Sequence, residues 1–177
     1  MKTLLLRSLA AGSLATTLIL GTAGTASAAP SRATLKAAAD TVVNEVVGGS
    51  NYGKVKAKYP TALNFTNDGC SVPAYIIAAS PALYGVLRAY GSVFEKSCDR
   101  HDFGYRNYGK NTTTPGVHPK FDPTSARKHA IDSRFYSNMK IQCDQKYGNP
   151  ITTGACKVAA RTFYTAVDKA GGKAFFG

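Results

Sequence analysis

The residues of this chain that are best suited to chemistry lie in one segment, Ser97-Cys98-Asp99-Arg100-His101-Asp102-Phe103-Gly104-Tyr105-Arg106-Asn107-Tyr108-Gly109. Cys98 comes three positions before His101 and Tyr105 comes four positions after it, so a helix would place all three on one face. Asp102 would then be turned by about 100° from His101 around the helix axis. This arrangement suits a histidine that activates water beside a carboxylate that holds a metal ion.

His101 is the histidine best placed to act as a general base. Of the other two histidines, His118 lies in a predicted loop, and His129 follows the basic pair Arg127-Lys128 in a stretch that we expect to be exposed. A histidine deprotonates water best when a carboxylate fixes its tautomer and stabilises the cation that forms. A partner carboxylate should therefore face His101.

Asp132 is the carboxylate that we expect to orient His101, because the side chain of Asp102 points elsewhere on its own helix. Asp132 falls on a predicted inward face of a later helix, and an inward aspartate needs a partner. One alternative is a salt bridge from Asp132 to Lys128, four positions earlier on the same helix. Asp122 is the rival carboxylate, although helix capping already explains it.

The chain has four cysteines, Cys70, Cys98, Cys143 and Cys156. An even count in a secreted chain predicts two disulfides, for which three connectivities are possible. A zinc site is the competing interpretation, but the sequence has no Cys-x-x-Cys pair of the kind that zinc sites use.

A metal site depends on one of these pairings. If Cys70 pairs with Cys98, the turn that contains Asp68 and Gly69 would be held about one helical turn from Asp102. The two carboxylates could then share a cation, with the Gly69 carbonyl and water completing the shell, and oxygen ligands of this kind suit calcium. The other two cysteines are then left for a structural bond.

Residues 1–28 have the pattern of a signal peptide. Lys2 and Arg7 precede an apolar stretch, and Ala26-Ser27-Ala28 is a small-residue cleavage pattern. The alternative of a membrane anchor is weaker, because the apolar run falls short of the ~20 residues that a span needs. We therefore expect a secreted, extracellular protein that starts near Ala29.

The chain is basic, with a formal net charge of +12, and removal of Lys2 and Arg7 lowers it to +10. A basic secreted protein is attracted to anionic membranes, nucleic acids or acidic polysaccharides. The basic residues are scattered along the sequence, so the charge does not identify one of these partners. We expect a monomer, the default for a small secreted domain with disulfides.

Apolar periodicity predicts a small all-α domain with few strand signals. The expected elements are a helix over 33–47, a loop over 51–69, one or two short helices within 72–94, a motif helix that ends at Gly109, a loop over 111–120, a helix that begins at Asp122-Pro123 and runs to about Cys143, a break at Asn149-Pro150 and Gly154, and a last helix over 155–170.

Three segments in order carry a resemblance to a known family. Cys98-Asp99-Arg100-His101-Asp102-Phe103-Gly104-Tyr105-Arg106-Asn107 closely resembles the motif of the secreted bacterial and fungal phospholipases A2. Asp68-Gly69-Cys70 resembles the calcium loop of that family, and Arg127-Lys128-His129-Ala130-Ile131-Asp132-Ser133-Arg134-Phe135-Tyr136 resembles its second catalytic helix. The resemblance covers the chain from about residue 68 to the C-terminus. It implies a disulfide-stabilised helical fold in which two antiparallel helices face the active site.

The resemblance also implies an activity at a phospholipid membrane or micelle surface. His101 would deprotonate a water that attacks the sn-2 ester of a glycerophospholipid, and Asp132 would hold the imidazole. Ca²⁺, held by Asp68, the Gly69 carbonyl and Asp102, would bind the phosphate and stabilise the oxyanion. Tyr105 would line the site near the phosphate. The products would be a lysophospholipid and a free fatty acid.

On this interpretation, residues 29–177 form one phospholipase A2-like domain, in which 29–67 are an N-terminal helix and loop and 68–177 are the catalytic core. Two alternatives stay open. A basic secreted ribonuclease would need His118 and His129 to converge with His101, which nothing in the sequence indicates, so we expect no nucleic acid partner. A non-enzymatic membrane-active or effector protein would use the same helices as an inert scaffold.

Overall fold

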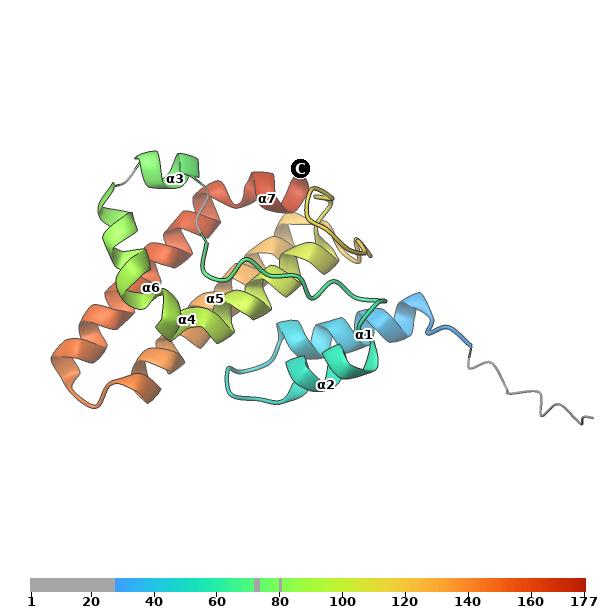
Figure 1. Cartoon of the computed structure of the whole chain (residues 1–177), viewed down its shortest axis with the longest axis horizontal. Helices are drawn as coiled ribbons and strands as arrows, with labels where there is room; N and C mark the ends of the chain where they lie inside the picture. Colours follow the sequence, from blue (N-terminus) through green and yellow to red (C-terminus); the bar gives the residue numbers. More distant parts are fainter. Residues whose placement is uncertain (1–27, 72–73, 80) are drawn as a thin grey trace, which may run out of the picture.

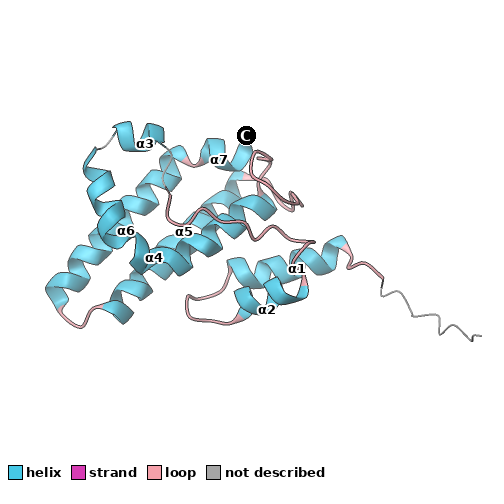
Figure 2. Cartoon of the chain, in the orientation of Figure 1, coloured by secondary structure: helices cyan, strands magenta, loops and turns pink. Residues whose placement is uncertain are grey.

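The structure, a computed structural model, describes residues 28–71, 74–79 and 81–177, and within these residues it is all-helical without strands (Figures 1 and 2). The helices are α1 (Arg32–Val43), α2 (Asn51–Lys58), α3 (Ala74–Ala79), α4 (Pro81–Tyr108), α5 (Ser125–Lys146), α6 (Pro150–Ala170) and α7 (Gly172–Phe176). The predicted all-α class is confirmed. The predicted signal peptide lies outside the described residues except for its last position, Ala28. In the described part of the chain, no helix combines the length and hydropathy that a membrane span requires.

The three long helices α4, α5 and α6 pack into a bundle in which neighbours in sequence run antiparallel (Figure 1). Along α4, Tyr108 meets Arg127 near the start of α5, whereas Ser97 meets Gln142 near its end. Along α5, Lys128 reaches Val167 near the end of α6. The disulfide Cys143–Cys156 joins the opposite ends of the same two helices.

Two apolar clusters form the core along α4. The first packs against the C-terminal end of α4, lies among α1, α2, α4, α5 and α7, and includes Val42 and Phe103. The second packs against the part of α4 that precedes His101, lies among α4, α5 and α6, and includes Phe94 and Phe163. The ring of His101 packs between members of both clusters, 4.2 Å from the Tyr105 ring and 4.6 Å from the Phe135 ring. The candidate base is therefore fixed where the two clusters meet.

Several predicted helix limits are wrong. The first helix ends at Val43, with Asn44 as its C-cap, rather than at Val47. The predicted loop over 51–69 contains α2, whose first amides, those of Asn51 and Tyr52, donate to the carboxylate of Glu45. Because this cap comes from outside the helix, the local sequence does not reveal it.

The starts of α5 and α6 also differ from the prediction. Thr124 rather than Asp122 caps α5, because its hydroxyl accepts a hydrogen bond from the Arg127 amide at 3.2 Å. The expected break at Asn149-Pro150 and Gly154 is absent, because α6 starts at Pro150 and continues through Gly154. The Asn149 side chain is the N-cap, and proline occupies the first turn.

The segment before the motif belongs to the motif helix, because α4 is continuous from Pro81 to Tyr108, with α3 before it. Its predicted end at Gly109 is confirmed to within one residue, because the last residue of α4 is Tyr108. A Cβ at Gly109 would lie 2.5 Å from the carbonyl oxygen of Phe175. The glycine thus lets the C-terminal helix α7 approach the end of α4.

Candidate active site

Gly104 of the motif lets α4 and α5 come close enough to form one site. A Cβ at Gly104 would lie 2.9 Å from Cγ2 of Ile131, closer than real Cβ contacts. Ile131 is buried directly beside Asp132, and Gly104 follows His101 by three positions. Close packing of Gly104 on Ile131 therefore brings the motif histidine to the carboxylate on the neighbouring helix.

His101 and Asp132 are in direct contact. Nε2 of His101 lies 2.8 Å from Oδ1 of Asp132, and the two side chains are 8% and 0% exposed. Since an ionised carboxylate only accepts hydrogen bonds, it favours the tautomer that carries the proton on Nε2. The Nδ1 atom then keeps the lone pair that a general base needs.

Asp132 has two further partners. Its Oδ1 also accepts a hydrogen bond from the hydroxyl of Tyr105 at 2.8 Å, and its Oδ2 accepts one from Nζ of Lys128 at 2.7 Å. Burial alone would raise the pKa of Asp132, but the contacts with His101 and Lys128 outweigh it and hold the pKa below its usual value. Asp132 is therefore an ionised partner for the histidine, and its salt bridge with Lys128 forms together with the contact to His101 rather than in place of it.

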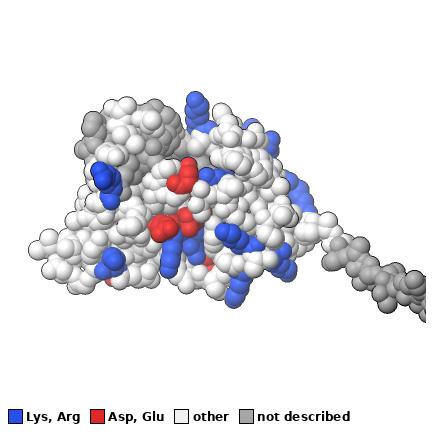
Figure 3. All heavy atoms as spheres, in the orientation of Figure 1, with Lys and Arg blue, Asp and Glu red and all other residues white. Residues whose placement is uncertain are grey.

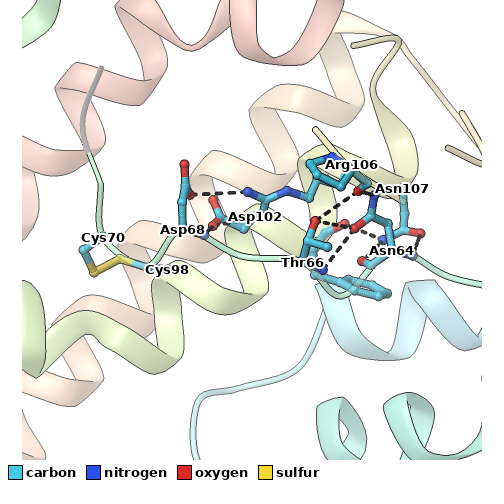
Figure 4. Close-up of polar contacts among 10 residues, drawn as sticks. Asn64, Thr66, Asp68, Cys70, Cys98, Asp102, Arg106 and Asn107 are labelled. Carbon is cyan, nitrogen blue, oxygen red and sulfur yellow. Dashed lines mark hydrogen bonds and ion pairs between the residues drawn. A yellow bond between two sulfur atoms is a disulfide. The ribbon is translucent and has the colours of Figure 1, made fainter. Parts of the chain in front are cut away.

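The segment before Cys70 is laid along α4 in the opposite direction (Figure 4). Asn107 accepts a hydrogen bond from the Asn64 amide at 2.9 Å and donates one to the Asn64 carbonyl at 2.8 Å. At the other end, the disulfide Cys70–Cys98 ties the segment to α4. These two attachments place Asp68 beside Asp102.

Asp68, Asp102 and Arg106 form a charged cluster (Figure 4). The Asp68 amide donates to Oδ2 of Asp102 at 3.1 Å. The guanidinium of Arg106 lies between the carboxylates, with Nη1 3.0 Å from Oδ2 of Asp102 and Nη2 3.4 Å from Oδ1 of Asp68. Nε and Nη1 of this buried arginine have no well-aligned hydrogen bond, so its contact with Asp102 is one of charge.

The two carboxylates influence each other's ionisation. Burial, together with the neighbouring Asp68, raises the pKa of Asp102 to about 7, although Arg106 opposes this. Burial would also raise the pKa of Asp68, but its hydrogen bonds to Asp102 and Ser71 and the charge of Arg106 hold it below its usual value. The pair therefore binds a proton more tightly than an ordinary carboxyl does, and a bound cation could replace that proton.

The donor set of this cluster fits calcium better than zinc. It offers two carboxylates and the Gly69 carbonyl, in a turn where Gly69 has a φ of +68°. Among the described residues, no group of three or more His, Cys, Asp or Glu side chains could hold a metal ion. Calcium accepts mixed shells of carboxylate, carbonyl and water oxygens, whereas structural zinc sites use four protein ligands.

A small cavity of about 50 Å³ joins the histidine to the acidic cluster. It has room for a water molecule. Its described lining residues come from the disulfide-bonded segment, α4, α5 and α6, and they are Gly69, Cys70, Ser71, Cys98, His101, Asp102, Phe135, Phe163, Ala166 and Val167.

The other histidines contact other groups. Nε2 of His118 lies 2.9 Å from the Thr114 carbonyl, and Nε2 of His129 lies 3.5 Å from the Ser133 hydroxyl. Contacts between either histidine and His101 are absent from the described residues. Tyr105 points its hydroxyl at Asp132, so its predicted place near a phosphate stays a prediction.

Sequence reasoning missed two charged residues of the site. Arg106 follows Asp102 by four positions, and this helical spacing was the signal for their ion pair. The spacing of Lys128 from Asp132 predicts only a salt bridge between them, and the second contact of Lys128, to the end of α6, has no local signal. On the face in Figure 3, acidic side chains gather near the centre, and basic side chains are scattered around them.

Comparisons with known proteins show the family to which the chain is similar. The sequence profile described as prokaryotic phospholipase A2 matches residues 50–171, a range that includes every candidate catalytic and metal-binding residue. The chain is also similar to the secretory phospholipase A2 of Beauveria bassiana (strain ARSEF 2860), with 31% identity over 113 residues. These residues are 64% of this chain and 46% of the relative, so the chain spans about half the length of the curated relative that it matches.

Proposed function

The chain belongs to the prokaryotic phospholipase A2 family, and we propose that it is a secreted, calcium-dependent phospholipase A2. It would hydrolyse the sn-2 ester of glycerophospholipids to a lysophospholipid and a free fatty acid. The observation that carries the proposal is the 2.8 Å contact between Nε2 of His101 and the buried, ionised Asp132, beside a cavity that Asp102 also lines.

His101 would act as the general base. Nδ1 takes a proton from a water molecule while the water oxygen bonds to the ester carbonyl carbon. Asp132 holds the Nε2 proton and stabilises the imidazolium that forms. When the bond between the acyl carbon and the glycerol oxygen breaks, the imidazolium returns the proton to that oxygen. Tyr105 donates to the same carboxylate oxygen, and burial and the nearby Asp132 raise its pKa, so it stays a neutral donor.

Asp68, Asp102 and the Gly69 carbonyl would hold the calcium ion. When bound, calcium supplies positive charge for the substrate phosphate and for the carbonyl oxygen that becomes negative. The protein's own part is to bring the ligands together, through the Cys70–Cys98 disulfide and the pairing of Asn64 with Asn107.

The setting of the reaction follows from the same features. Two disulfides and the similarity to a secretory relative support an extracellular location. The basic net charge supports action at an anionic membrane or micelle surface. We propose that the mature protein starts near Ala29 and acts as a monomer.

The test is release of fatty acid from phosphatidylcholine labelled at sn-2, measured with calcium and with EGTA. His101→Asn is compared with wild type, and His129→Asn is the matched control, because His129 is exposed on α5. We expect release that needs calcium and His101 and is unchanged by His129→Asn. Failure of the folded wild-type protein to release fatty acid at any calcium concentration would sink the proposal and favour a non-enzymatic membrane-active protein.

A further inference from the structure

Lys128 is a buried lysine whose ammonium group has three hydrogen-bond acceptors. Its side chain is 10% exposed. Its Nζ lies 2.7 Å from Oδ2 of Asp132, 2.9 Å from the Val167 carbonyl and 3.4 Å from the Asp168 carbonyl. An ammonium group has three donors, and a lysine is seldom buried unless it is paired. These three acceptors use the whole donor capacity of Lys128.

The two carbonyls belong to the last turn of α6. Carbonyls at the C-terminal end of a helix carry partial negative charge, and most of them lack a partner within the helix. The Val167 carbonyl already accepts from the Gly171 amide at 2.8 Å, so Lys128 is its second donor. Lys128 thus joins the end of α6 to the carboxylate that faces His101.

The oxygens of Asp132 are divided between two sets of donors. Oδ1 accepts hydrogen bonds from His101 and Tyr105, and Oδ2 accepts one from Lys128. Rotation of the carboxylate would break contacts on both oxygens. We propose that Lys128 is a positioning residue for the reaction, which fixes the Asp132 carboxylate and makes the end of α6 part of the active-site support. This inference rests on the proposed roles of His101 and Asp132.

The turn after α6 passes close to the same network, with space for a glycine but not for a larger residue. A Cβ at Gly171 would lie 2.6 Å from the Tyr105 hydroxyl oxygen and 2.4 Å from the Val167 carbonyl oxygen. A larger residue would therefore push the turn after α6 away from both Tyr105 and Lys128. Gly171→Ala perturbs the support while it leaves the Lys128 side chain present.

The chain contains its own control for an ordinary salt bridge. Lys36 and Asp40 have the same spacing as Lys128 and Asp132, and their charged atoms are 2.8 Å apart. That pair is partly exposed, at 38% and 31%, and lies on α1. Exposed pairs of this kind contribute little to stability. Lys36→Met removes the same charge from the same local geometry, outside the candidate active site.

The experiment measures kcat and KM of Lys128→Met, Gly171→Ala and Lys36→Met at saturating calcium, with circular dichroism as the check of folding. A misplaced carboxylate acts in the transition state, so we expect kcat to fall by about 10- to 100-fold in the first two variants, with KM within about threefold. Lys36→Met should match wild type. The downfield proton resonance of His101 Nε2–H should shift or vanish in Lys128→Met, which a purely structural role would not predict.

A folded Lys128→Met protein with the kcat of Lys36→Met and an unchanged His101 resonance would overturn the inference. If Lys128→Met does not fold, Gly171→Ala decides in the same way: a kcat loss without a KM change supports the inference, and wild-type kinetics overturn it. His101→Asn, measured beside them, separates the two proposals. If it is inactive while the Lys128 variant is active, only this inference fails, whereas an active His101→Asn rejects the proposed base.

Discussion

At the scale of single residues, the carboxylate beside His101 makes the sharpest prediction. Asp132→Asn removes the charge that stabilises an imidazolium and favours the wrong tautomer. We expect kcat to fall by roughly 10²- to 10⁴-fold, as for similar changes in catalytic triads. Calcium affinity should change little, because the partners of Asp132 are His101, Tyr105 and Lys128 rather than the acidic cluster.

Kinetics measure kcat of Asp132→Asn, and calorimetric titration with calcium measures its calcium affinity. Asp122→Asn is the control, because Asp122 accepts from Thr124 and pairs with Arg127 instead. Full activity in Asp132→Asn would show that the orienting carboxylate is misassigned.

Asp102 gives a prediction about pH. Its pKa is raised to about 7, and calcium binding requires the ionised carboxylate. We therefore expect calcium affinity to fall as the pH drops through 7, by up to about tenfold per unit. Calorimetric titrations at pH 6, 7 and 8 measure it. Asp102→Asn should bind calcium weakly and lose most of this pH dependence, and a pH-independent wild type would contradict the assignment.

The same shift affects the stability of the calcium-free protein. The folded carboxyl binds its proton more tightly than the unfolded one, whose pKa is near the ordinary 3.8. The folded state therefore carries more protons between these values, and stability falls as the pH rises from about 4 through 7. Thermal unfolding in EGTA from about pH 4 to pH 7 should show the decrease of stability that Asp102 causes, and this decrease should be smaller in Asp102→Asn.

Among the site residues, a local signal was necessary for prediction but did not always suffice, since Arg106 was missed although it follows Asp102 at helical spacing. His101 and Asp132 were predictable, because one follows a helical motif spacing and the other is an aspartate on an inward face. The second partners of Lys128 could not be inferred, because the carbonyls of Val167 and Asp168 are 39 and 40 positions away. Backbone acceptors leave no trace in a sequence pattern.

At the scale of elements, the segment over 64–71 depends on its two attachments to α4. The Cys70–Cys98 disulfide holds the end next to the proposed calcium ligands. Replacing both cysteines with serine should weaken calcium binding by at least about tenfold, because the ligands must be ordered on binding. Calorimetry of the folded variant measures this change, and wild-type affinity would show that Asn64 and Asn107 hold the segment by themselves.

The misread helices show what sequence patterns leave ambiguous. Asn149-Pro150 predicts a break, but a capping side chain followed by proline is equally typical of a helix start, which the structure shows here. For α2, the sequence Asn51-Tyr-Gly-Lys-Val-Lys-Ala-Lys has little apolar periodicity, and its helix forms against Glu45 and the first apolar cluster. Helices that depend on tertiary partners are the ones that periodicity misses.

At the scale of the whole molecule, we expect the second disulfide to contribute to stability but not to calcium binding or catalysis. Cys143–Cys156 joins α5 and α6 at the ends remote from the Lys128 contacts, and its sequence separation is 13. Replacing both cysteines with serine should lower the free energy of unfolding by about 3 kcal/mol, the value expected for a loop of about this length.

Denaturant unfolding measures that loss. Calcium affinity and kcat at low temperature should match wild type, in contrast with the Cys70–Cys98 replacement. Equal losses of calcium affinity in both variants would mean that the bundle transmits strain from one end to the other.

The continuity of α4 also limits how the length of this chain can change. Cys98, His101, Asp102, Arg106 and Asn107 all lie on one uninterrupted helix, so helix geometry alone sets their relative directions. An insertion of one residue among them would rotate everything downstream by about 100° and part the histidine from the ligand segment. The loop between α4 and α5 is not helical, but part of it is also fixed, because the Asn64 side chain donates to the carbonyls of Pro115 and Val117. Natural length variation and engineered insertions should therefore be accepted near the exposed Thr112 and Thr113 and rejected within the motif helix.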